Sequence, residues 1–322
     1  MVYNKYIGII GGTGTIGSII VKYLLQLQTH FHVLIGGRRS IKEISMSTFY
    51  NSERLKYNQM NYNNDVELDN FCSQCLLVIN AVGPSFKIND KIALHALRNN
   101  CHYIDIGGYG ILRDLLKPYE KSIEAQKLCF IIGVGWMPGI SGVFSKTIIE
   151  THLNSPENTN FNIYYGAVDN WSYSSTYDLA ASSMGKTRSY VYSHGKEIQV
   201  SPFRYTHHKF FPFIGHKKIC MPSFDEQLTQ LATSLKQIRK ISTFIMLNDY
   251  ISMGKFMFIK IFYKHNLNKA TLMLQDDYQR LVKKENKWGS VICQVSKIEP
   301  ERKIDTFYYL YTKNNLLYTA LP

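Results

Sequence analysis

The chain has 322 residues, enough for about two domains of ordinary size, and its apolar content of 45% is that of a globular protein. This composition excludes disorder as the dominant state. The formal net charge is +13, which favours an anionic partner, but the sequence contains no long run of like charges. We therefore expect no nucleic-acid partner.

The longest apolar-looking stretch covers residues 244–263 and contains two lysines, an aspartate and an asparagine, so it falls short of a membrane span. The N-terminus passes directly into an apolar strand and a glycine-rich turn, which leaves no room for a signal peptide. The six cysteines are too few and too scattered for a disulfide framework. We therefore expect a soluble, cytoplasmic protein with no membrane partner.

The first part of the chain alternates short apolar runs with longer amphipathic ones, the pattern of βαβ units and a parallel sheet. Strands are predicted at Tyr6–Ile10, His32–Ile35, Leu55–Asn61, Leu76–Ala81, His102–Ile106 and Cys129–Val134. Helices are predicted at Ser18–Leu27 and Ile88–Asn99, and Ser40-Ile41-Lys42-Glu43 is predicted to be a capping box that opens another helix. Residues 1–140 are therefore predicted to form a doubly wound, Rossmann-type α/β domain with strand order 3-2-1-4-5-6.

The pattern changes after Ser141, and residues 141–322 are predicted to form an α+β domain on a largely antiparallel sheet. A helix is predicted at Ile140–Leu153 and a long helical segment at Phe224–Tyr250. Strands are predicted at Phe161–Val168, Arg188–Val191, Glu197–Val200, Lys269–Gln275, Ser290–Ile298 and Thr306–Tyr318. The expected roles of this domain are substrate binding and dimerisation, so a homodimer is a candidate assembly.

A glycine motif follows the first strand directly and opens the first helix. The spacing Gly12-x-Gly14-x-x-Gly17 in this strand–turn–helix context indicates a dinucleotide site. Gly12 permits the tight turn, Gly14 lets backbone N–H groups approach a pyrophosphate at the helix N-terminus, and Gly17 lets the helix pack closely on the sheet. The predicted cofactor contacts here are Gly12, Thr13, Gly14, Thr15, Ile16 and Gly17. The alternative is a glycine-rich turn that binds nothing.

The end of the second strand predicts which dinucleotide is bound. An NAD-selective site places Asp or Glu against the ribose 2′-hydroxyl at this point. The chain instead reads Gly36-Gly37-Arg38-Arg39-Ser40, in which two guanidinium groups and a hydroxyl can hold a 2′-phosphate. Arg38, Arg39 and Ser40 therefore favour NADP(H) over NAD, with Arg38 as the main phosphate contact. The alternative is that one of these arginines is only solvated.

Three further strand ends are predicted to meet at the same edge of the sheet, where ligands of open α/β sheets bind. The fourth strand ends in a turn of small residues predicted to carry the cofactor: Asn80, Ala81, Val82, Gly83 and Pro84. The fifth ends at Asp105-Ile106-Gly107-Gly108, and the sixth continues into Gly133-Val134-Gly135. Asp105 is the candidate catalytic residue, and the alternative is that it only holds a backbone turn.

These segments resemble the saccharopine dehydrogenase-like (saccharopine reductase) NADP-binding family. The resemblance rests on the Gly-Gly-Thr-Gly-Thr-Ile-Gly turn, Ile79-Asn-Ala-Val-Gly-Pro84, Cys101-His-Tyr-Ile-Asp105 and Gly135-Trp-Met-Pro-Gly-Ile-Ser-Gly142. It implies pyridine-nucleotide binding at the glycine turn. In the best-known members it also implies hydride transfer to or from a C–N bond that links an amino acid to a keto-acid skeleton. The resemblance does not place an acid–base residue on the second domain.

Other motifs fit less well. Short-chain dehydrogenases need Tyr-x-x-x-Lys on a helix, but Tyr192-Ser-His-Gly-Lys196 contains glycine and Tyr309-Leu-Tyr-Thr-Lys313 lies in a predicted hairpin. Cys72-Ser-Gln-Cys75 has zinc-like spacing without a second pair, so core cysteines and no metal are expected. Four histidines lie close together in the second half of the chain, at His194, His207, His208 and His216. They predict either a basic loop that meets substrate carboxylates or a solvated loop.

The sequence thus predicts an NADP(H)-dependent oxidoreductase. Its reaction is expected to transfer hydride to or from a C=N or similarly polarised double bond of a small, carboxylate-bearing substrate, with the cofactor supplying the chemistry. The alternative is a non-catalytic NADP-binding regulator that reports redox state, which the lack of an identifiable proton donor favours.

Overall fold

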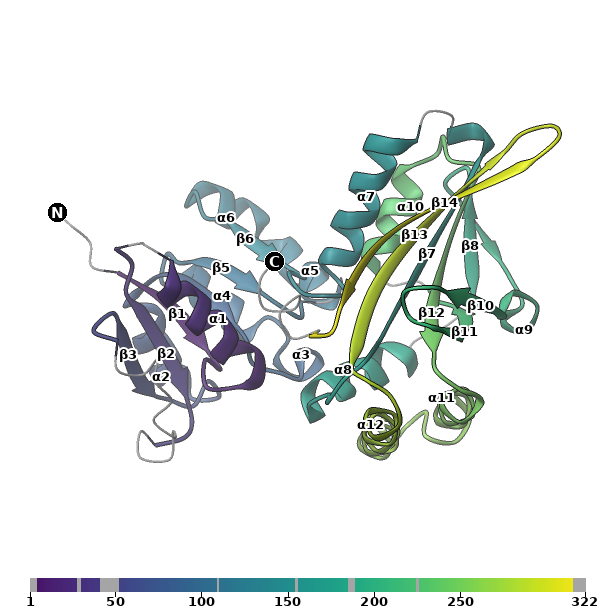
Figure 1. Cartoon of the computed structure of the whole chain (residues 1–322). Helices are drawn as coiled ribbons and strands as arrows, with labels where there is room; N and C mark the ends of the chain where they lie inside the picture. The colour runs from purple at the N-terminus through teal and green to yellow at the C-terminus, as the bar shows by residue number, and fades with distance from the viewer. Residues whose placement is uncertain are drawn as a thin grey trace. The chain divides into compact units, whose positions relative to one another are not determined.

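The computed structural model describes residues 5–27, 30–40, 52–108, 110–153, 156–184, 189–223 and 226–314. These residues divide into two compact units, the first ending at Trp136 and the second beginning at Met137. Each unit is built on a β-sheet with helices packed against it (Figure 1). None of the helices in these ranges combines the length and apolar character needed to cross a bilayer.

The first unit contains a six-stranded sheet of order β3-β2-β1-β4-β5-β6 in which every neighbouring pair runs parallel. Its strands are β1 (Tyr6–Ile10), β2 (Val33–Gly37), β3 (Leu55–Gln59), β4 (Cys75–Asn80), β5 (His102–Asp105) and β6 (Phe130–Ile132). This is the predicted doubly wound order, with the strands at the predicted places. The predicted fold class of the first domain is therefore confirmed.

Helices cover both faces of this sheet because successive strand residues point to opposite sides. Ile9 belongs to a buried cluster with Ile20 of α1, whereas Ile10 belongs to a second cluster with Phe71 of α2 and Ile92 of α4. The helices are α1 (Thr15–Gln26), α2 (Asp65–Cys72), α3 (Ser85–Ile88), α4 (Lys91–Arg98), α5 (Gly110–Leu116), the short η2 (Lys117–Tyr119) and α6 (Glu120–Ala125).

One predicted helix of this unit is interrupted in the structure, and one predicted helix start lies mostly outside the described residues. The predicted helix Ile88–Asn99 is broken, because Asn89 adopts a φ of 52° that ends α3 before α4 begins. The predicted capping box falls mostly on residues 41–43, which lie outside the described residues.

The Cys72-Ser-Gln-Cys75 pair supplies core cysteines, as predicted, whereas Cys129 of the same unit is exposed. Cys72, Cys75 and Cys101 are buried free thiols, and the thiol of Cys101 donates to the carbonyls of Cys72 at 3.1 Å and Cys75 at 3.2 Å. Burial raises the pKa of the Cys101 thiol to about 11. No cluster of His, Cys, Asp and Glu suited to a metal ion occurs in the part of the chain that the structure describes.

The second unit contains a larger sheet of order β10-β11-β12-β7-β13-β14, with the β8–β9 hairpin beside β12. Only the β7–β12 pair runs parallel among the described pairs of this sheet, so the predicted largely antiparallel sheet is confirmed. The strands are β7 (Thr159–Val168), β8 (Tyr190–Ser193), β9 (Lys196–Gln199), β10 (His207–Phe211), β11 (His216–Pro222), β12 (Lys240–Leu247), β13 (Trp288–Ile298) and β14 (Lys303–Thr312).

Helices α8, α11 and α12 carry apolar residues into buried clusters with strands of this sheet. The helices of the unit are α7 (Ile140–His152), η3 (Pro156–Asn158), α8 (Tyr173–Met184), α9 (Pro202–Tyr205), α10 (Glu226–Ser234), α11 (Tyr250–Phe262) and α12 (Leu267–Lys284). The predicted helix at Ile140–Leu153 corresponds to α7.

The predicted strand at Lys269–Gln275 is wrong, since this segment lies inside α12. Its apolar residues alternate in sequence, but Leu272 is 58% exposed whereas Ala270 and Leu274 are buried. Buried positions therefore recur at helical spacing, and the Asn266 side chain caps the helix by accepting from the backbone N–H of Lys269 at 3.0 Å.

The predicted long helix at Phe224–Tyr250 is also wrong, because α10 is followed by the central strand β12. Alternate residues of this strand are buried on opposite faces of the sheet. Phe244 and Met246 join one cluster, whereas Leu247 joins another. A strand buried on both faces reads as a continuous apolar run, which its sequence alone does not distinguish from a buried helix.

The predicted basic loop around the histidine group is instead a β-hairpin formed by β10 and β11. His207 and His208 lie in β10, and His216 begins β11. His194 is separate from them, in the β8–β9 turn with a φ of 49°. Strand pairing thus orders residues whose polar composition is typical of a loop.

Helix α11 is fixed at its N-terminus by Asp249. The Asp249 carboxylate accepts from the backbone N–H of Ser252 at 2.8 Å and from the Arg280 guanidinium at 2.6 and 2.9 Å. Burial alone raises the pKa of this carboxyl group, but the Arg280 and Ser252 hydrogen bonds outweigh burial and lower the pKa to about 2. The carboxylate therefore stabilises the folded state only while it is charged.

Asp249→Asn is expected to lower the free energy of unfolding at neutral pH by on the order of 1 kcal/mol, allowing for solvent screening. The folded pKa lies below the ordinary value of 3.8. The difference in free energy of unfolding between the parent and the variant should therefore be complete above pH 3.8 and should disappear as the pH falls toward 2. Urea unfolding of both proteins across this range measures the difference, and a difference that does not change with pH contradicts the assignment.

Candidate functional site

The glycine turn between β1 and α1 has the close packing that its spacing predicts. Gly11 has a φ of 83°, and the backbone N–H of Gly14 donates to its carbonyl at 2.8 Å. A Cβ at Gly17 would lie 2.2 Å from the Gly11 carbonyl oxygen, and a Cβ at Gly12 would lie 2.7 Å from the side chain of Ile35. Gly12 and Gly17 are therefore required by the fold of the turn itself.

Gly14 differs because its surroundings are open. A Cβ there would meet the Gly11 carbonyl at 3.1 Å and no other heavy atom within 4 Å. Gly14 is the N-cap of α1 and has no side chain to bond the first backbone N–H groups, those of Thr15, Ile16 and Gly17. The first turn of the helix also carries no acidic residue. These groups fit the pyrophosphate of a dinucleotide, because an anion there would meet unpaired donors and the positive end of the helix.

The loop after β2 reaches back to the glycine turn. The guanidinium of Arg39 donates to the Thr13 carbonyl at 2.7 Å, and both Arg38 and Arg39 are exposed. Tyr57 of β3 holds this loop, because its hydroxyl donates to the carbonyls of Gly37 at 3.0 Å and Arg39 at 2.5 Å. The structure thus brings Arg39 to the glycine turn, and Tyr57 holds the arginine loop through contacts that the sequence did not indicate.

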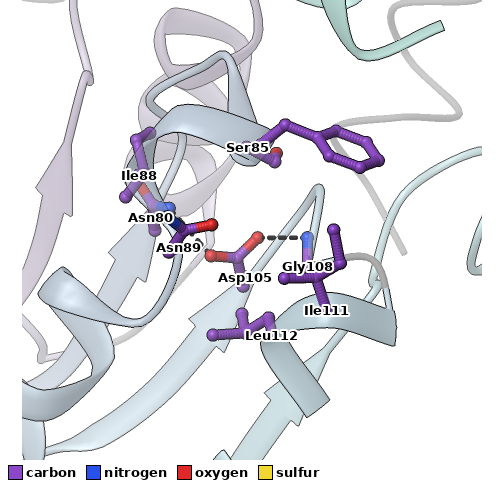
Figure 2. A pocket seen from close by; sticks show the side chains of 9 residues that line it. Asn80, Ser85, Ile88, Asn89, Asp105, Gly108, Ile111 and Leu112 are labelled. Atoms are coloured by element: carbon purple, nitrogen blue, oxygen red, sulfur yellow. Dashed lines mark hydrogen bonds between the residues drawn. The ribbon is translucent and has the colours of Figure 1, made fainter. Parts of the chain in front are cut away.

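At the ends of β4 and β5, Asn80 and Asp105 bind each other (Figure 2). The Asn80 amide donates to Asp105 Oδ2 at 2.8 Å, and Asn80 Oδ1 accepts from the backbone N–H of Val82 at 3.0 Å. Asp105 Oδ2 also accepts from the Tyr103 hydroxyl at 2.5 Å, and Oδ1 accepts from the Gly108 N–H at 2.5 Å. With 2% of its surface exposed, Asp105 directs both oxygens inward, and it fixes the turns after both strands.

Tyr103 acts as a permanent donor to Asp105. Burial, together with the neighbouring Asp105 charge, raises the pKa of the Tyr103 hydroxyl well above its usual value. The phenol therefore stays protonated at any physiological pH, and its proton remains on the hydrogen bond to the carboxylate.

The predicted convergence of strand ends occurs within the first unit. A Cβ at Gly11 would lie 3.0 Å from the carbonyl oxygen of Ala81, so the glycine turn packs against the turn after β4. The backbone N–H of Val134 donates to the Asp105 carbonyl at 3.0 Å, and a Cβ at Gly108 would lie 3.1 Å from the Gly133 nitrogen. Glycines make these approaches possible, and the ends of four strands meet at one edge of the sheet.

A small pocket opens beside Asp105; its roughly 280 Å³ of empty space includes open solvent, and its enclosed part has room for about one water molecule. Figure 2 displays the side chains around it. The lining residues come from the end of β4, from α3 and its C-terminus, and from the β5–α5 segment: Asn80, Ser85, Phe86, Ile88, Asn89, Asp105, Gly108, Ile111 and Leu112. Polar and apolar side chains are therefore mixed around the pocket, and the Asn80–Asp105 pair lies among them.

Ser85 and Asn89 are pocket residues that the sequence analysis missed. Ser85 directly follows the Asn80–Pro84 turn. A Cβ placed on Gly107 would lie only 1.8 Å from the Ser85 hydroxyl oxygen, so the two residues are close neighbours. Asn89 reaches the pocket because its positive φ ends α3 there. Asn89, near the start of the predicted helix Ile88–Asn99, was a usable signal because asparagine tolerates a positive φ, whereas nothing local to Ser85 indicated its proximity to Gly107.

The two Tyr-x-x-x-Lys sequences are not on helices. Tyr192 and Lys196 lie on opposite strands of the β8–β9 hairpin, whose turn contains Gly195 with a φ of 73°. Tyr309 lies in β14. The helical geometry that lets a lysine lower the pKa of such a tyrosine is therefore missing from both, as predicted.

The glycine turn, the arginines after β2 and the parallel sheet define the first unit as a dinucleotide-binding domain of the Rossmann class. Residues 7–129 match the family described as "Saccharopine dehydrogenase NADP binding domain". This match, to an NADP-binding domain of the saccharopine dehydrogenase family, covers most of the first unit and supports the family resemblance and the predicted cofactor, NADP(H). No curated protein matches the chain.

Solved structures resemble the chain in fold. Apo saccharopine dehydrogenase (L-Glu forming) from Saccharomyces cerevisiae is 13% identical, with 98% of this chain and 88% of that chain covered and a TM-score of 0.63. DAP dehydrogenase from C. glutamicum is 11% identical, with 99% and 86% covered and a TM-score of 0.47. The similarity to the yeast enzyme covers both units and shows a common fold.

Proposed function

We propose that this chain is an NADP(H)-dependent oxidoreductase of the saccharopine dehydrogenase type. Its substrate would carry a C=N or similarly polarised double bond and a carboxylate. The observation that carries the proposal is that an open glycine turn, two arginines and a small pocket beside the Asn80–Asp105 pair lie at the same edge of the sheet. The family match over residues 7–129 supports the cofactor, and the pocket supports a small-molecule substrate beside it.

The proposed cofactor contacts are those predicted from the sequence. Gly12, Thr13 and Gly14 with the first turn of α1 would hold the pyrophosphate, and Arg38 with Arg39 would hold the 2′-phosphate. Asn80 and the following turn to Pro84 would lie along the rest of the dinucleotide. When bound, NADPH supplies the hydride, while the residues of the chain orient the reactants and exclude water.

Asp105 remains the candidate catalytic residue, but its hydrogen bonds favour a positioning role. Both of its oxygens already accept from Tyr103, Asn80 and Gly108, so transferring a proton to substrate would break an internal bond. In this role Asp105 fixes the two strand-end turns, and the pocket beside them keeps its shape.

A carboxylate on the substrate is supported by charge. The chain is strongly cationic at +13.

The proposed function is tested by turnover. NADPH oxidation is followed with a panel of imines, mixtures of keto acids with amines, and enones. Steady turnover with a carboxylate-bearing imine supports the full proposal. NADPH binding without turnover on any member of the panel leaves the chain a non-catalytic NADP-binding regulator. That alternative is favoured by one observation: Asp105, the only ionisable residue among those lining the pocket, is fully hydrogen-bonded.

Cofactor selectivity gives a separate test. A charge-assisted contact between a guanidinium and a phosphate contributes roughly 1.5–3 kcal/mol, so Arg38→Ala should weaken NADPH binding about ten- to a hundredfold. NADH binding should stay nearly unchanged, because NADH has no 2′-phosphate. Arg39→Ala should give a smaller loss, since part of its guanidinium is engaged by the Thr13 carbonyl.

Calorimetric titration of both nucleotides against the parent and both variants measures these effects. Added salt should weaken NADPH more than NADH, because the additional contact is electrostatic. Equal affinity of the parent protein for the two nucleotides would refute the proposed phosphate contacts.

A further inference from the structure

Helix α11 has an outward face made almost wholly of large apolar side chains. Six of its residues are exposed: Tyr250, Ile251, Gly254, Phe258, Ile261 and Phe262. The five large side chains among them have exposed fractions between 39% and 66%. None of the six carries a charge. We call these residues the α11 outward face.

The opposite side of α11 accounts for its attachment to the unit. Ser252, Phe256 and Ile259 are buried, and the last two pack in a cluster with β11, β12 and α12. These buried residues therefore supply the contacts between α11 and the core of the unit. The outward face is an additional apolar surface that the packing of the unit does not explain.

The neighbouring helix α12 provides an internal comparison (Figure 1). It lies beside α11 and is also amphipathic, but only one of its exposed residues, Leu272, is apolar. The other exposed residues of α12 are Asn268, Lys269, Asp276, Gln279, Lys283 and Lys284. An apolar outward face is therefore a property of α11 and not of helices on this side of the unit.

The charge beyond the C-terminal end of the face is basic, whereas Asp249 caps the N-terminus of α11 and the exposed Asp276 pairs with Lys255. Residues 250–275 contain four lysines and a histidine and no acidic residue. Lys264 and His265 directly follow α11, Lys269 lies in the first turn of α12, and all three are exposed. Lys255 is different, because it forms an ion pair with Asp276 at 2.7 Å. The end of the apolar face is thus bordered by basic side chains available to an anionic surface.

We propose that the α11 outward face binds the surface of a membrane that contains anionic phospholipid. A helix of 13 residues is about 20 Å long, so α11 can lie in the plane of the interface with its apolar side chains among the acyl chains. Phe258 and Phe262 would insert their rings, while Lys264 and Lys269 would meet phosphate groups. The sequence excluded a membrane span in this stretch, and in-plane binding needs none.

A second copy of the chain fits the face less well. Symmetric pairing of two such faces with the helices parallel would bring Lys264 and Lys269 close to their own copies, which is unfavourable, and antiparallel pairing is the arrangement that the dimer measurement below would detect. A specific protein partner would need directional contacts, but the only polar group on the face, the Tyr250 hydroxyl, already pairs with His208 Nε2 at 2.9 Å. A lipid surface requires no directional contact, only apolar area and positive charge.

The test is co-sedimentation of the full-length protein with vesicles of phosphatidylcholine, with and without phosphatidylserine. The parent should bind, and phosphatidylserine should strengthen its binding. Phe258→Ser combined with Phe262→Ser should weaken binding by about tenfold or more, because two large apolar side chains no longer insert. Lys264→Gln combined with Lys269→Gln should remove most of the effect of phosphatidylserine, about fivefold per lysine.

Matched control variants distinguish binding through the α11 outward face from nonspecific binding to vesicles. Phe203 is a 77% exposed phenylalanine on α9, and Lys121 and Lys127 are exposed lysines of the first unit. Phe203→Ser, and Lys121→Gln with Lys127→Gln, should bind vesicles as the parent does. Thermal unfolding and NADPH binding verify that every variant is folded, and Ile261→Ser gives a milder test of the same face.

Three outcomes overturn the proposal. The first is a parent that does not bind vesicles containing phosphatidylserine. The second is binding that the phenylalanine variants leave unchanged. The third is a concentration-dependent dimer, measured by light scattering, that the phenylalanine variants abolish in a protein without vesicle affinity, since a second copy would then cover the face.

Discussion

Gly14→Val is expected to abolish detectable NADPH binding while leaving the protein folded. The backbone of Gly14 is extended, with φ at −81° and ψ at 176°, a conformation that valine adopts readily. Its Cβ would meet one carbonyl oxygen at 3.1 Å and otherwise enter open space. That space is where the pyrophosphate must approach the N-terminus of α1, so the valine side chain excludes the ligand without disturbing the core.

Gly17→Ala provides the contrast. The added Cβ would lie 2.2 Å from the Gly11 carbonyl oxygen and 2.8 Å from the Gly12 Cα, both parts of the backbone. The turn or the helix must move, and the variant should lose stability on the order of 1–3 kcal/mol in addition to losing NADPH. The methyl group added in Gly17→Ala thus destabilises the fold more than the larger side chain added in Gly14→Val. The reason is that Gly17 packs against the turn, whereas Gly14 faces the ligand.

Fluorescence titration with NADPH and thermal unfolding of both variants decide between these roles. Gly14→Val with parental affinity would show that the nucleotide binds elsewhere. Gly17→Ala with parental stability would contradict the packing of α1 against the glycine turn.

The first unit could be predicted almost completely because its signals are local. Most strands are short apolar runs, and Gly12, Gly14 and Gly17 mark where the first strand becomes a helix. Parallel strands with helical connections then permit few strand orders. The arginines after β2 could be located for the same reason, since strand ends of such a sheet share one edge.

The second unit was harder because its pairings are not local. Strand β12 lies between β7 and β11, which are distant from each other in the sequence, and it is apolar on both faces. Lys269–Gln275 alternates like a strand, yet the exposure of Leu272 is decided by the neighbours of α12. In both cases, tertiary packing overrides a local pattern that was ambiguous.

The role of Asp105 could not be predicted for a related reason. The sequence placed a carboxylate at a strand end, which is equally compatible with catalysis and with holding a turn. The three donors that surround it come from β4, from its own strand and from the following loop, so only the folded arrangement identifies them. Ser85 is similar, since its contact with Gly107 joins segments that are distant in sequence.

Asp105→Asn is therefore expected to act mainly through structure. An asparagine has one acceptor oxygen where the carboxylate has two, so its amide would face a donor from Gly108 or from Tyr103 and Asn80. Leaving buried donors unsatisfied costs about 1–3 kcal/mol, and the free energy of unfolding should fall by that amount. Because the turns that hold the cofactor depend on this carboxylate, NADPH affinity and turnover should decline together.

Tyr103→Phe separates positioning from proton transfer at Asp105. It removes one of three donors and leaves the carboxylate in place, so the loss of stability and of NADPH affinity should be a fraction of that caused by Asp105→Asn. If Asp105 transferred a proton to substrate, Asp105→Asn would lower kcat far more than NADPH affinity, and Tyr103→Phe would shift the pH profile of kcat. Measuring stability, NADPH affinity and the pH dependence of kcat for both variants distinguishes the two. Parallel losses with an unshifted pH profile assign Asp105 to the architecture of the site, and a selective loss of kcat assigns it to the chemistry.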